Sequence, residues 1–371
     1  MSNAHIPFRY DYVGSFLRPD VLKQARADFE AEIISREALT AVEDAAIRDL
    51  VAKQKKAGYS VITDGEFRRA TWHLDFMWGF QGVGHSRTDT GLPFHDEAAL
   101  IDDTYLTGKI SVDHHPFVDH FKFVKALEDA HTVAKQTIPA PAQFLEQMIM
   151  PMNIQGTRTF YATTQELIDD IAAGYRKVIR ALYDAGCRNI QLDDCSWGVC
   201  VDPNALGFFG TDAAGLAEVE EQLLAVNDLA LRDKPADLTV TTHICRGNFH
   251  STWACQGGYD AVAELVFGRE DVDAYYLEFD DERSGSFAPL KAVSGDKKVV
   301  LGLITTKSPV LEQKNAVIAR IHEAAQYLPL DRLCLSPQCG FASCEVGNKL
   351  TEEEQWAKLT LVKEIAEEVW G

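Results

Sequence analysis

The order of strand-like and helix-like segments constrains the fold of this chain more than any other feature. Short runs rich in β-branched residues alternate with longer amphipathic stretches from one end to the other. Such alternation predicts βα units and a parallel sheet that is buried on both faces. The expected strands are 12–14, 60–63, 133–138, 188–192, 238–242, 274–277, 298–303 and 333–336, and helices are expected over segments such as 164–185, 213–232, 257–267, 311–327 and 351–369. Eight such units predict an α/β fold of the (β/α)8 TIM-barrel type rather than an open sheet.

One stretch interrupts this regular order. Residues 81–131 are polar and rich in His, Asp and Gly, so we interpret them as an insertion after strand two, with a hairpin around 106–112. The chain contains no internal repeat and no Pro/Ser-rich linker. We therefore expect residues 5–371 to form a single barrel domain.

Charge and cysteine content narrow the function classes. The chain has 36 basic and 56 acidic side chains, a formal charge of −20. This balance argues against nucleic acid or an anionic membrane as partner and favours a small-molecule ligand. No apolar run is as long as a membrane span, and the N-terminus lacks a signal-peptide core. The eight cysteines, all between Cys187 and Cys344, are expected to be reduced in a cytoplasmic protein. The sequence does not indicate an oligomeric state.

Chemically active residues gather where the expected strands end. In a (β/α)8 barrel the reactive groups lie at the carboxyl ends of the strands and in the loops that follow. A barrel without a site would have little reason to place polar and metal-binding residues at nearly every one of these positions. The residues at these exits include Ser15, Glu66, Asp193, His243, Cys245, Glu278, Lys307 and Cys339.

Four of these residues have the chemistry of a metal site. His243 and Cys245 are two positions apart, so both side chains lie on one face of an extended strand. With Glu278 and Cys339 they combine imidazole, carboxylate and thiolate ligands, which match tetrahedral zinc. Taken singly, each residue is as well explained as a buried structural side chain. A metal site is favoured because side chains from three strand exits would converge on one point. Spacing alone, however, leaves both the metal site and the buried structural role open.

Taken together, the motifs resemble a known family. Gly14-Ser15-Phe16, Asp64-Gly65-Glu66, Gln191-Leu192-Asp193, His243-Ile244-Cys245, Glu278 and Pro337-Gln338-Cys339-Gly340 occur in the order seen in cobalamin-independent methionine synthase. The resemblance, over about 12–369, is to the C-terminal catalytic barrel of that enzyme and, more closely, to its short single-barrel homologues. It implies a catalytic zinc held by His243, Cys245, Glu278 and Cys339, and a thiol substrate.

The same resemblance implies how the substrate's amino-acid end is held. The turn at Ser15 would bind the carboxylate of homocysteine, and Glu66 and Asp193 would bind its ammonium group through charge-assisted hydrogen bonds. Each residue also has a structural alternative. Ser15 could cap a helix before Pro19, Glu66 could form a salt bridge with Arg68 or Arg69, and Asp194 rather than Asp193 could point inward.

The chain also departs from the family pattern at two positions. The family's proton-donating histidine precedes a Ser-Pro pair, whereas here Lys307 precedes Ser308-Pro309. The exit of strand three, 140–147, has no tryptophan where the family places one against a pterin. Trp72, Trp78 and Trp197 are candidates for a different pocket, and the methyl or alkyl donor stays open.

These observations lead to a ranked set of functions. The first is a zinc-dependent thiol methyltransferase resembling 5-methyltetrahydropteroyltriglutamate-homocysteine S-methyltransferase, acting in methionine biosynthesis on homocysteine or an analogue. The second is a zinc-dependent thiol alkyltransferase or lyase of the epoxyalkane-coenzyme M transferase type, in which Lys307 would protonate the developing alkoxide. The third is a non-catalytic zinc- or thiol-binding barrel.

Overall fold

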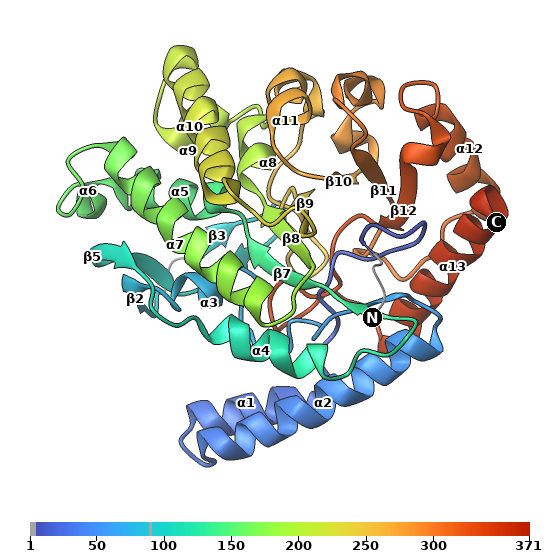
Figure 1. Ribbon diagram of the computed structural model, residues 1–371, viewed down its shortest axis with the longest axis horizontal. Coiled ribbons are helices and arrows are strands. Elements are labelled where there is room, and N and C mark those ends of the chain that lie inside the picture. Colours follow the sequence, from blue (N-terminus) through green and yellow to red (C-terminus); the bar gives the residue numbers. More distant parts are fainter. Residues whose placement is uncertain (1–4, 89–90) are drawn as a thin grey trace.

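A parallel sheet forms the framework of the computed structural model, which describes residues 5–88 and 91–371. Six neighbouring strands pair in register, and two short strands, β1 and β6, form a second parallel pair. Because β6 leads directly into β7, the β1–β6 pair extends the six-stranded sheet, which is seen in Figure 1, into one continuous band of strands. The strands are β1 (Val61–Ile62), β6 (Val133–Ala134), β7 (Gln136–Pro139), β8 (Asn189–Asp194), β9 (Thr239–Ile244), β10 (Ala274–Glu278), β11 (Lys298–Ile304) and β12 (Leu333–Pro337).

The N-terminal segment closes this band into a barrel. Tyr10 forms a parallel bridge with Leu335 of β12. On its other side, the Phe16 N–H donates to the Gly65 carbonyl at 3.1 Å, just after β1. The strand expected at 12–14 is therefore an extended segment held at its two edges rather than a regular strand. The other seven expected strands are confirmed within about two residues at each end.

Side chains on alternate positions of the strands point to two different cores. Tyr276, Val300 and Cys334 are buried together with Val13 in a small cluster, whereas their chain neighbours belong to the larger core. This alternation is the period of two expected for strands. Inside the ring, Lys135 forms a fully buried ion pair with Asp11, with 3.1 Å between Nζ and Oδ1.

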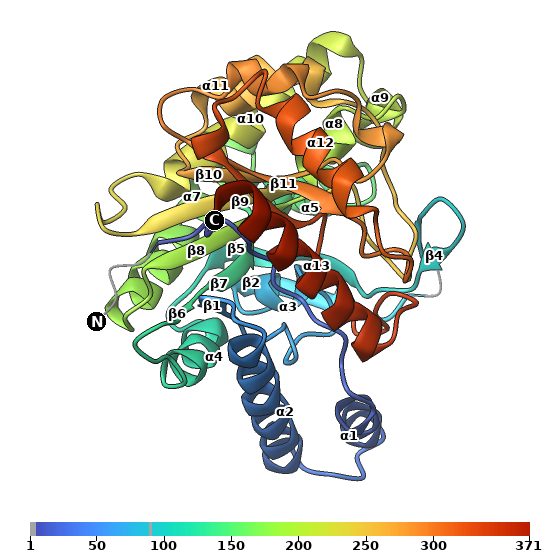
Figure 2. The same ribbon diagram turned by 90° about the vertical axis from the view of Figure 1, so that its right-hand side faces the viewer.

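Amphipathic helices cover the outside of the barrel, and several of them begin at a side-chain cap. Thr163 accepts a hydrogen bond from the Glu166 N–H at the start of α7, and Thr351 with Glu354 forms a capping box at α13. Within the described part of the chain, no helix is both long and apolar enough to span a membrane. The larger helices are α1 (Asp20–Glu30), α2 (Arg36–Lys56), α4 (Pro116–Lys125), α5 (Pro141–Ile149), α7 (Thr164–Asp184), α10 (Ala213–Leu231), α11 (Ala263–Arg269), α12 (Lys314–Ala324) and α13 (Glu352–Trp370). Figure 2 shows α13 running obliquely across the face that is turned toward the viewer.

Shorter helical turns lie between these elements. The helix expected at 257–267 is a 3-10 turn followed by α11, and the one expected at 311–327 is reduced to α12. The short α-helices are α3 (Leu74–Met77), α6 (Ile154–Thr157), α8 (Ser196–Cys200) and α9 (Ala205–Phe209), and the 3-10 turns are Tyr259–Ala261, Glu282–Ser284, Ala288–Ala292 and Leu330–Arg332.

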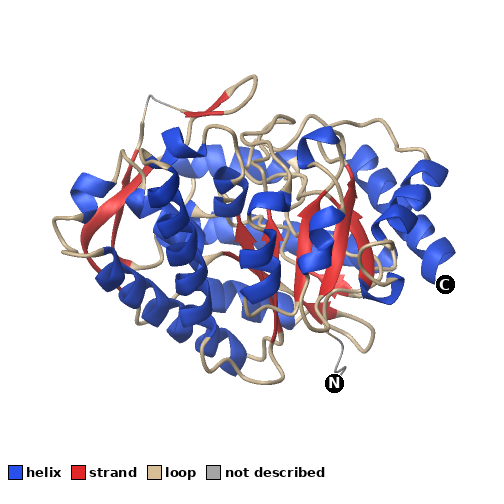
Figure 3. Ribbon diagram, turned by 90° about the horizontal axis from the view of Figure 1, so that it is seen from above, coloured by secondary structure: helices blue, strands red, loops and turns tan. Residues whose placement is uncertain are grey.

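The segment between β1 and β6 forms a separate two-stranded ribbon. β2 (Gln81–Ser86) pairs antiparallel with β5 (Asp103–Ser111), and Figure 3 shows this ribbon at one end of the molecule. A shorter hairpin joins β3 (Leu92–Pro93) to β4 (Ala98–Ala99). The expected hairpin around 106–112 is wrong, because most of these residues belong to the single strand β5. Its partner lies some twenty residues upstream, which the local pattern does not reveal.

A buried acidic group, formed by Glu270 and Asp194 with Asn227 between them, predicts how the stability of the fold depends on pH. Glu270 accepts a hydrogen bond from Asn227 Nδ2 at 2.9 Å, and burial followed by the nearby Asp194 raises the pKa of Glu270 to about 8. The unfolded chain releases this proton near pH ~4.3. Between these two values the folded state holds the extra proton, so stability falls as the pH rises.

We expect Glu270→Gln to remove part of this pH dependence. The variant should be more stable than the parent protein at pH 8, by on the order of a few kcal/mol, and nearly equal to it at pH 4. Urea denaturation at the two pH values measures the difference, with Glu323→Gln as an exposed control. An equal effect of Glu270→Gln at both pH values would contradict the assignment.

Candidate metal centre

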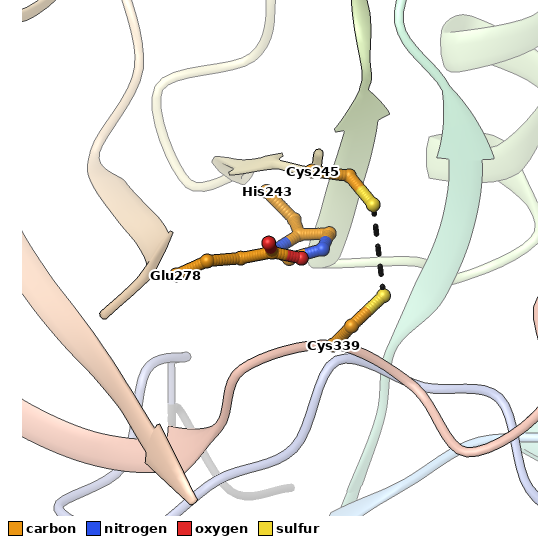
Figure 4. A group of neighbouring side chains, drawn as sticks. All are labelled: His243, Cys245, Glu278 and Cys339. Carbon is orange, nitrogen blue, oxygen red and sulfur yellow. Dashed lines mark hydrogen bonds between the residues drawn. The ribbon is translucent and has the colours of Figure 1, made fainter. Parts of the chain in front are cut away.

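His243, Cys245, Glu278 and Cys339 meet at the carboxyl end of the barrel. One ligand atom from each residue lies within 4.8 Å of one from every other, and all four residues are buried. Figure 4 shows the Cys245 and Cys339 sulfur atoms facing each other, with the His243 ring and the Glu278 carboxylate in the same space. The four residues that sequence spacing grouped as candidate ligands are therefore brought together.

The strand register explains why these side chains converge. Tyr276 of β10 pairs with His243 of β9, so Glu278 emerges from the sheet beside the end of β9. Cys245 follows β9 directly, and its backbone N–H donates to the Asp194 carbonyl at 2.9 Å. The segment after β12 brings Cys339 from the other side. The exits of β9, β10 and β12, all at one edge of the sheet, thus supply the whole set.

The geometry of the four side chains fits a tetrahedral zinc ion. Two sulfur ligands at ~2.3 Å from such an ion lie ~3.8 Å apart, and the two sulfur atoms are 3.7 Å apart. His243 Nδ1 lies 3.3 Å from the Tyr276 carbonyl, which directs Nε2 to the centre. His243 Nε2 and Glu278 Oε1 are buried without a hydrogen-bond partner. Buried polar atoms of this kind are suited to bind a metal ion.

Without a bound cation these ligands favour their protonated forms. Burial raises the pKa of Glu278 to about 7. Contact with the Cys245 thiol, and then burial, raises the pKa of Cys339 well above its usual value. A divalent ion reverses this preference, because coordination stabilises the thiolate and carboxylate forms. The buried His-Cys-Glu-Cys group is therefore consistent with a zinc site.

A cavity of about 690 Å³ opens beside the four residues. His243, Cys245 and Cys339 form part of its wall. Ser15, Glu66, Trp72 and Asp193 line the same cavity, although they come from other strand exits. Of the other candidate tryptophans, Trp197 is fully buried, and Trp78 donates its indole N–H to Thr104 at 3.0 Å.

The structure distinguishes between the structural and the ligand-binding roles expected for Ser15 and Glu66. The first helix begins at Asp20 with Pro19 at its N-cap, so Ser15 is not a helix cap. Glu66 Oε1 lies 3.1 Å from Arg69 Nη1, and Glu66 Oε2 is buried without a partner. One side of Glu66 is therefore structural, and the other is free to bind a ligand.

The paired aspartates after β8 have different surroundings. Asp193 lines the cavity and accepts a hydrogen bond from Gln191 Nε2 at 2.7 Å. Asp194 instead accepts hydrogen bonds from the backbone N–H and hydroxyl of Ser196. Burial and then the Glu66 charge raise the pKa of Asp193 well above its usual value. An ammonium group entering the cavity would stabilise the ionised form of Asp193.

Lys307 does not belong to the cavity wall. Its ammonium lies 2.6 Å from Asp280 Oδ2, and only 11% of the Lys307 side chain is exposed. The described residues that line the cavity do not include Lys307. A proton transfer from Lys307 would require this ion pair to open, and that role stays a prediction.

Three residues of the cavity were not assigned a role from the sequence. Glu146 comes from α5, His73 follows β1, and Cys195 follows β8. Cys195 contacts the Cys245 thiol. The only usable signal was the position of Cys195 next to the Asp193-Asp194 pair, because the positions of the other two depend on how helices pack over the barrel mouth.

A glycine in α8 supports the backbone of one ligand. A Cβ atom added at Gly198 would lie 2.3 Å from the Cys245 carbonyl oxygen and 3.3 Å from the Arg246 Cα. Both neighbours are backbone atoms, so the strain cannot be relieved by a side-chain rotation. The close approach of α8 therefore fixes the position of Cys245.

We expect Gly198→Ala to weaken zinc binding by about 10–100-fold, as changes behind metal ligands do. It should also destabilise the fold by about 1–3 kcal/mol through overpacking. Gly207→Ala in α9 is the matched control, since its added Cβ meets nothing within 4 Å. Competition with a chelator measures the affinity, and equal zinc affinity in the two variants would contradict the role of Gly198.

Comparison with known proteins places the chain in a family. The model described as "Cobalamin-independent synthase, Catalytic domain" matches residues 158–368, more than half of the chain. The chain belongs to the cobalamin-independent methionine synthase family. Uncharacterized protein YxjG of Bacillus subtilis (strain 168) is 44% identical over 369 residues, which cover 98% of this chain and 95% of YxjG.

Solved structures give the same result for the fold. A putative vitamin-B12 independent methionine synthase from Listeria monocytogenes is 38% identical, with a TM-score of 0.77 over 99% of each chain. A B12-independent methionine synthase from Shewanella sp. W3-18-1, solved in complex with selenomethionine, has a TM-score of 0.70 at 20% identity, over 97% of each chain. The α/β architecture is thus that of the family's catalytic domain.

Proposed function

We propose that this protein is a zinc-dependent thiol methyltransferase whose acceptor is homocysteine or a close analogue, with a role in methionine biosynthesis. In this proposal residues 5–371 act as one catalytic barrel, and 81–131 are an insertion at the barrel mouth. The observation that carries the proposal is the buried tetrad of His243, Cys245, Glu278 and Cys339 on the wall of a cavity. Membership in a family of methyltransferases supports it.

The tetrad would hold the zinc, which supplies one chemical effect when bound. Coordination lowers the pKa of a substrate thiol, ordinarily ~8.5, so that the sulfur is a nucleophilic thiolate near neutral pH. Two cysteines and one glutamate around the ion would keep the site rich in electrons, so that a bound thiol sulfur would stay nucleophilic. Glu278 would be the ligand most readily replaced by the thiol, because its carboxylate is the least soft of the four.

The other cavity residues would orient the amino acid. Ser15 and the backbone around Gly340 are candidates for the carboxylate, since the Ser15 hydroxyl and Gly340 are in close contact. Asp193 and the free oxygen of Glu66 are candidates for the ammonium group. Fixing both ends would place the sulfur at one point of the cavity, which is the main source of rate gain in such a transfer.

The test is a direct assay of the reaction. Zinc-loaded protein is incubated with homocysteine and a panel of methyl donors, and methionine is quantified by mass spectrometry. Methionine formation that depends on zinc is the expected result. Thiol consumption only with epoxides would favour the alkyltransferase alternative, and thiol binding without any product would favour a non-catalytic barrel.

A further inference from the structure

The ionisable side chains that line the cavity are mostly acidic. Carboxyl groups line the cavity at several places, yet no lysine or arginine does so in the part of the chain that the structure describes. His73 also lines it, but burial lowers the pKa of His73 to about 3, so its ring is neutral. The acidic residues of the wall are Glu66, Asp102, Asp103, Glu146 and Asp193.

Glu146 is an acidic residue that has no role in the binding of the thiol substrate proposed above. It is 5% exposed, and its Oε2 accepts a hydrogen bond from Gln143 Nε2 at 2.9 Å. No ion pair among residues 5–88 and 91–371 includes Glu146. A buried carboxyl group without a cation is costly in its ionised form. Burial, and then the charge of Asp194, raise the pKa of Glu146 to about 8, so a cation bound beside it would stabilise its ionised form.

The position of Glu146 places that ligand beside the metal centre. Gln143 links Glu146 to Cys195, since its Nε2 donates to Glu146 and its Oε1 accepts from the Cys195 backbone N–H at 3.0 Å. Cys195 in turn contacts Cys245, one of the four candidate zinc ligands. A cation paired with Glu146 would thus lie near the sulfur that is methylated.

A buried polar atom without a partner also points to a ligand. His73 is 6% exposed, lines the cavity and has no hydrogen-bond partner for Nδ1. Its ring stacks on Trp72, with 4.4 Å between the ring centroids. A polar atom of a bound molecule would satisfy His73 Nδ1 in a neutral hydrogen bond.

The remaining wall suits a polarisable, weakly hydrated cation. Aromatic rings attract such cations through their electron-rich faces, and methionine sulfur packs well against methyl groups. The aromatic and thioether side chains of the wall are Trp72, Phe94, Tyr105, Met150, Met152 and Phe208.

We propose that the methyl donor is a small onium compound, in which the transferred methyl group is bonded to a positively charged sulfur or nitrogen. The proposal rests on the methyltransferase function proposed above and names its second substrate class. The thiolate sulfur attacks the methyl carbon, and a carbon–sulfur bond forms. The bond between that carbon and the onium atom breaks, and its electron pair stays on the departing sulfur or nitrogen. The leaving group departs neutral, so the step requires no proton donor.

The same wall disfavours a donor that carries several carboxylates. Such a molecule needs arginine or lysine side chains to neutralise it, and the described lining supplies none. Repulsion from the acidic wall would add to its cost of entry. A polyglutamyl folate is therefore the opposite of what this cavity favours.

Binding of a matched pair of probes tests the charge preference without relying on turnover. Choline and 3,3-dimethylbutan-1-ol have nearly the same shape and differ in the positive charge. Calorimetry on the zinc-loaded protein should give choline at least ~10-fold tighter binding. In Glu146→Gln, which keeps an acceptor for Gln143, this preference should fall about tenfold while binding of the neutral alcohol is unchanged.

Turnover tests the donor class itself. Deuteromethyl-labelled S-methylmethionine or glycine betaine should give labelled methionine from homocysteine, and methyl-folate should not. Turnover with methyl-folate alone, or equal binding of choline and its neutral counterpart, would overturn the proposal while leaving the methyltransferase function intact. Failure of homocysteine to reach the bound zinc would overturn both. If Glu146→Gln does not fold, the ratio of the affinities of the parent protein for choline and for 3,3-dimethylbutan-1-ol tests the charge preference by itself.

Discussion

Cys339→Ser is expected to leave the protein folded but to remove its zinc. One of four ligands contributes about 3–4 kcal/mol of the binding free energy of such sites, so zinc affinity should fall by ~10²–10³-fold. Serine is nearly the same size as cysteine, but its hydroxyl is a far weaker metal ligand than a thiolate. Metal analysis after exposure to a chelator should find about one zinc per chain in the parent protein and almost none in the variant.

Cys187→Ser is the matched control for this change. Cys187 is also fully buried, and its sulfur lies 3.4 Å from the Asn189 carbonyl oxygen, which serine can still reach as a donor. The control should keep its zinc and its thiol chemistry. Retention of zinc by Cys339→Ser under conditions that leave the control unchanged would remove Cys339 from the ligand set.

Asp193→Asn is expected to weaken homocysteine binding by about 10–100-fold. A hydrogen bond to a charged group contributes about 1.5–3 kcal/mol, and the amide removes the charge with little change in shape. The thiol 4-sulfanylbutanoate lacks the amino group and should bind the parent protein and the variant equally. Titration of both thiols against both proteins separates the ammonium contact from a general effect on the cavity.

Zinc content provides the internal control for this experiment. Asp193 is not among the four candidate ligands, so the variant should bind one zinc per chain. An equal loss of affinity for both thiols would show that Asp193 supports the fold of the cavity rather than the ammonium group. No loss for either thiol would exclude it from substrate binding.

The grouping of the four candidate metal ligands could be predicted from the sequence because it depends on local pattern and strand order. His243 and Cys245 share a strand face, and Glu278 and Cys339 lie at the carboxyl ends of β10 and β12, two strands of the same parallel sheet with β11 between them. Parallel strands bring their carboxyl ends to one edge, so residues far apart in the chain converge there without any further information.

Lys307 shows where this reasoning stops. Its place after a strand exit predicted a position in the cavity, but its ammonium pairs with Asp280, which follows the neighbouring strand. Both residues were visible in the sequence. Which of several nearby charges pair with each other depends on side-chain packing and burial, and spacing along the chain does not encode that choice.

The β2–β5 ribbon and the place of Glu146 in the cavity wall could not be predicted from the sequence for a similar reason. β2 and β5 pair across a long connection, and the alternation within β5 does not identify its partner. Glu146 lies on a helix whose sequence reads as ordinary amphipathic structure. Its chemical setting arises only from the packing of α5 over the barrel mouth, beside Cys195.

X-ray absorption at the zinc edge, with and without homocysteine, tests the central claim most directly. The four-residue centre predicts two sulfur ligands and two nitrogen or oxygen ligands in the protein alone, with zinc–sulfur distances of ~2.3 Å. Addition of homocysteine should raise the count to three sulfur ligands as Glu278 moves away. A sulfur count that stays at two, or a metal environment without sulfur, would contradict a zinc centre that activates a thiol.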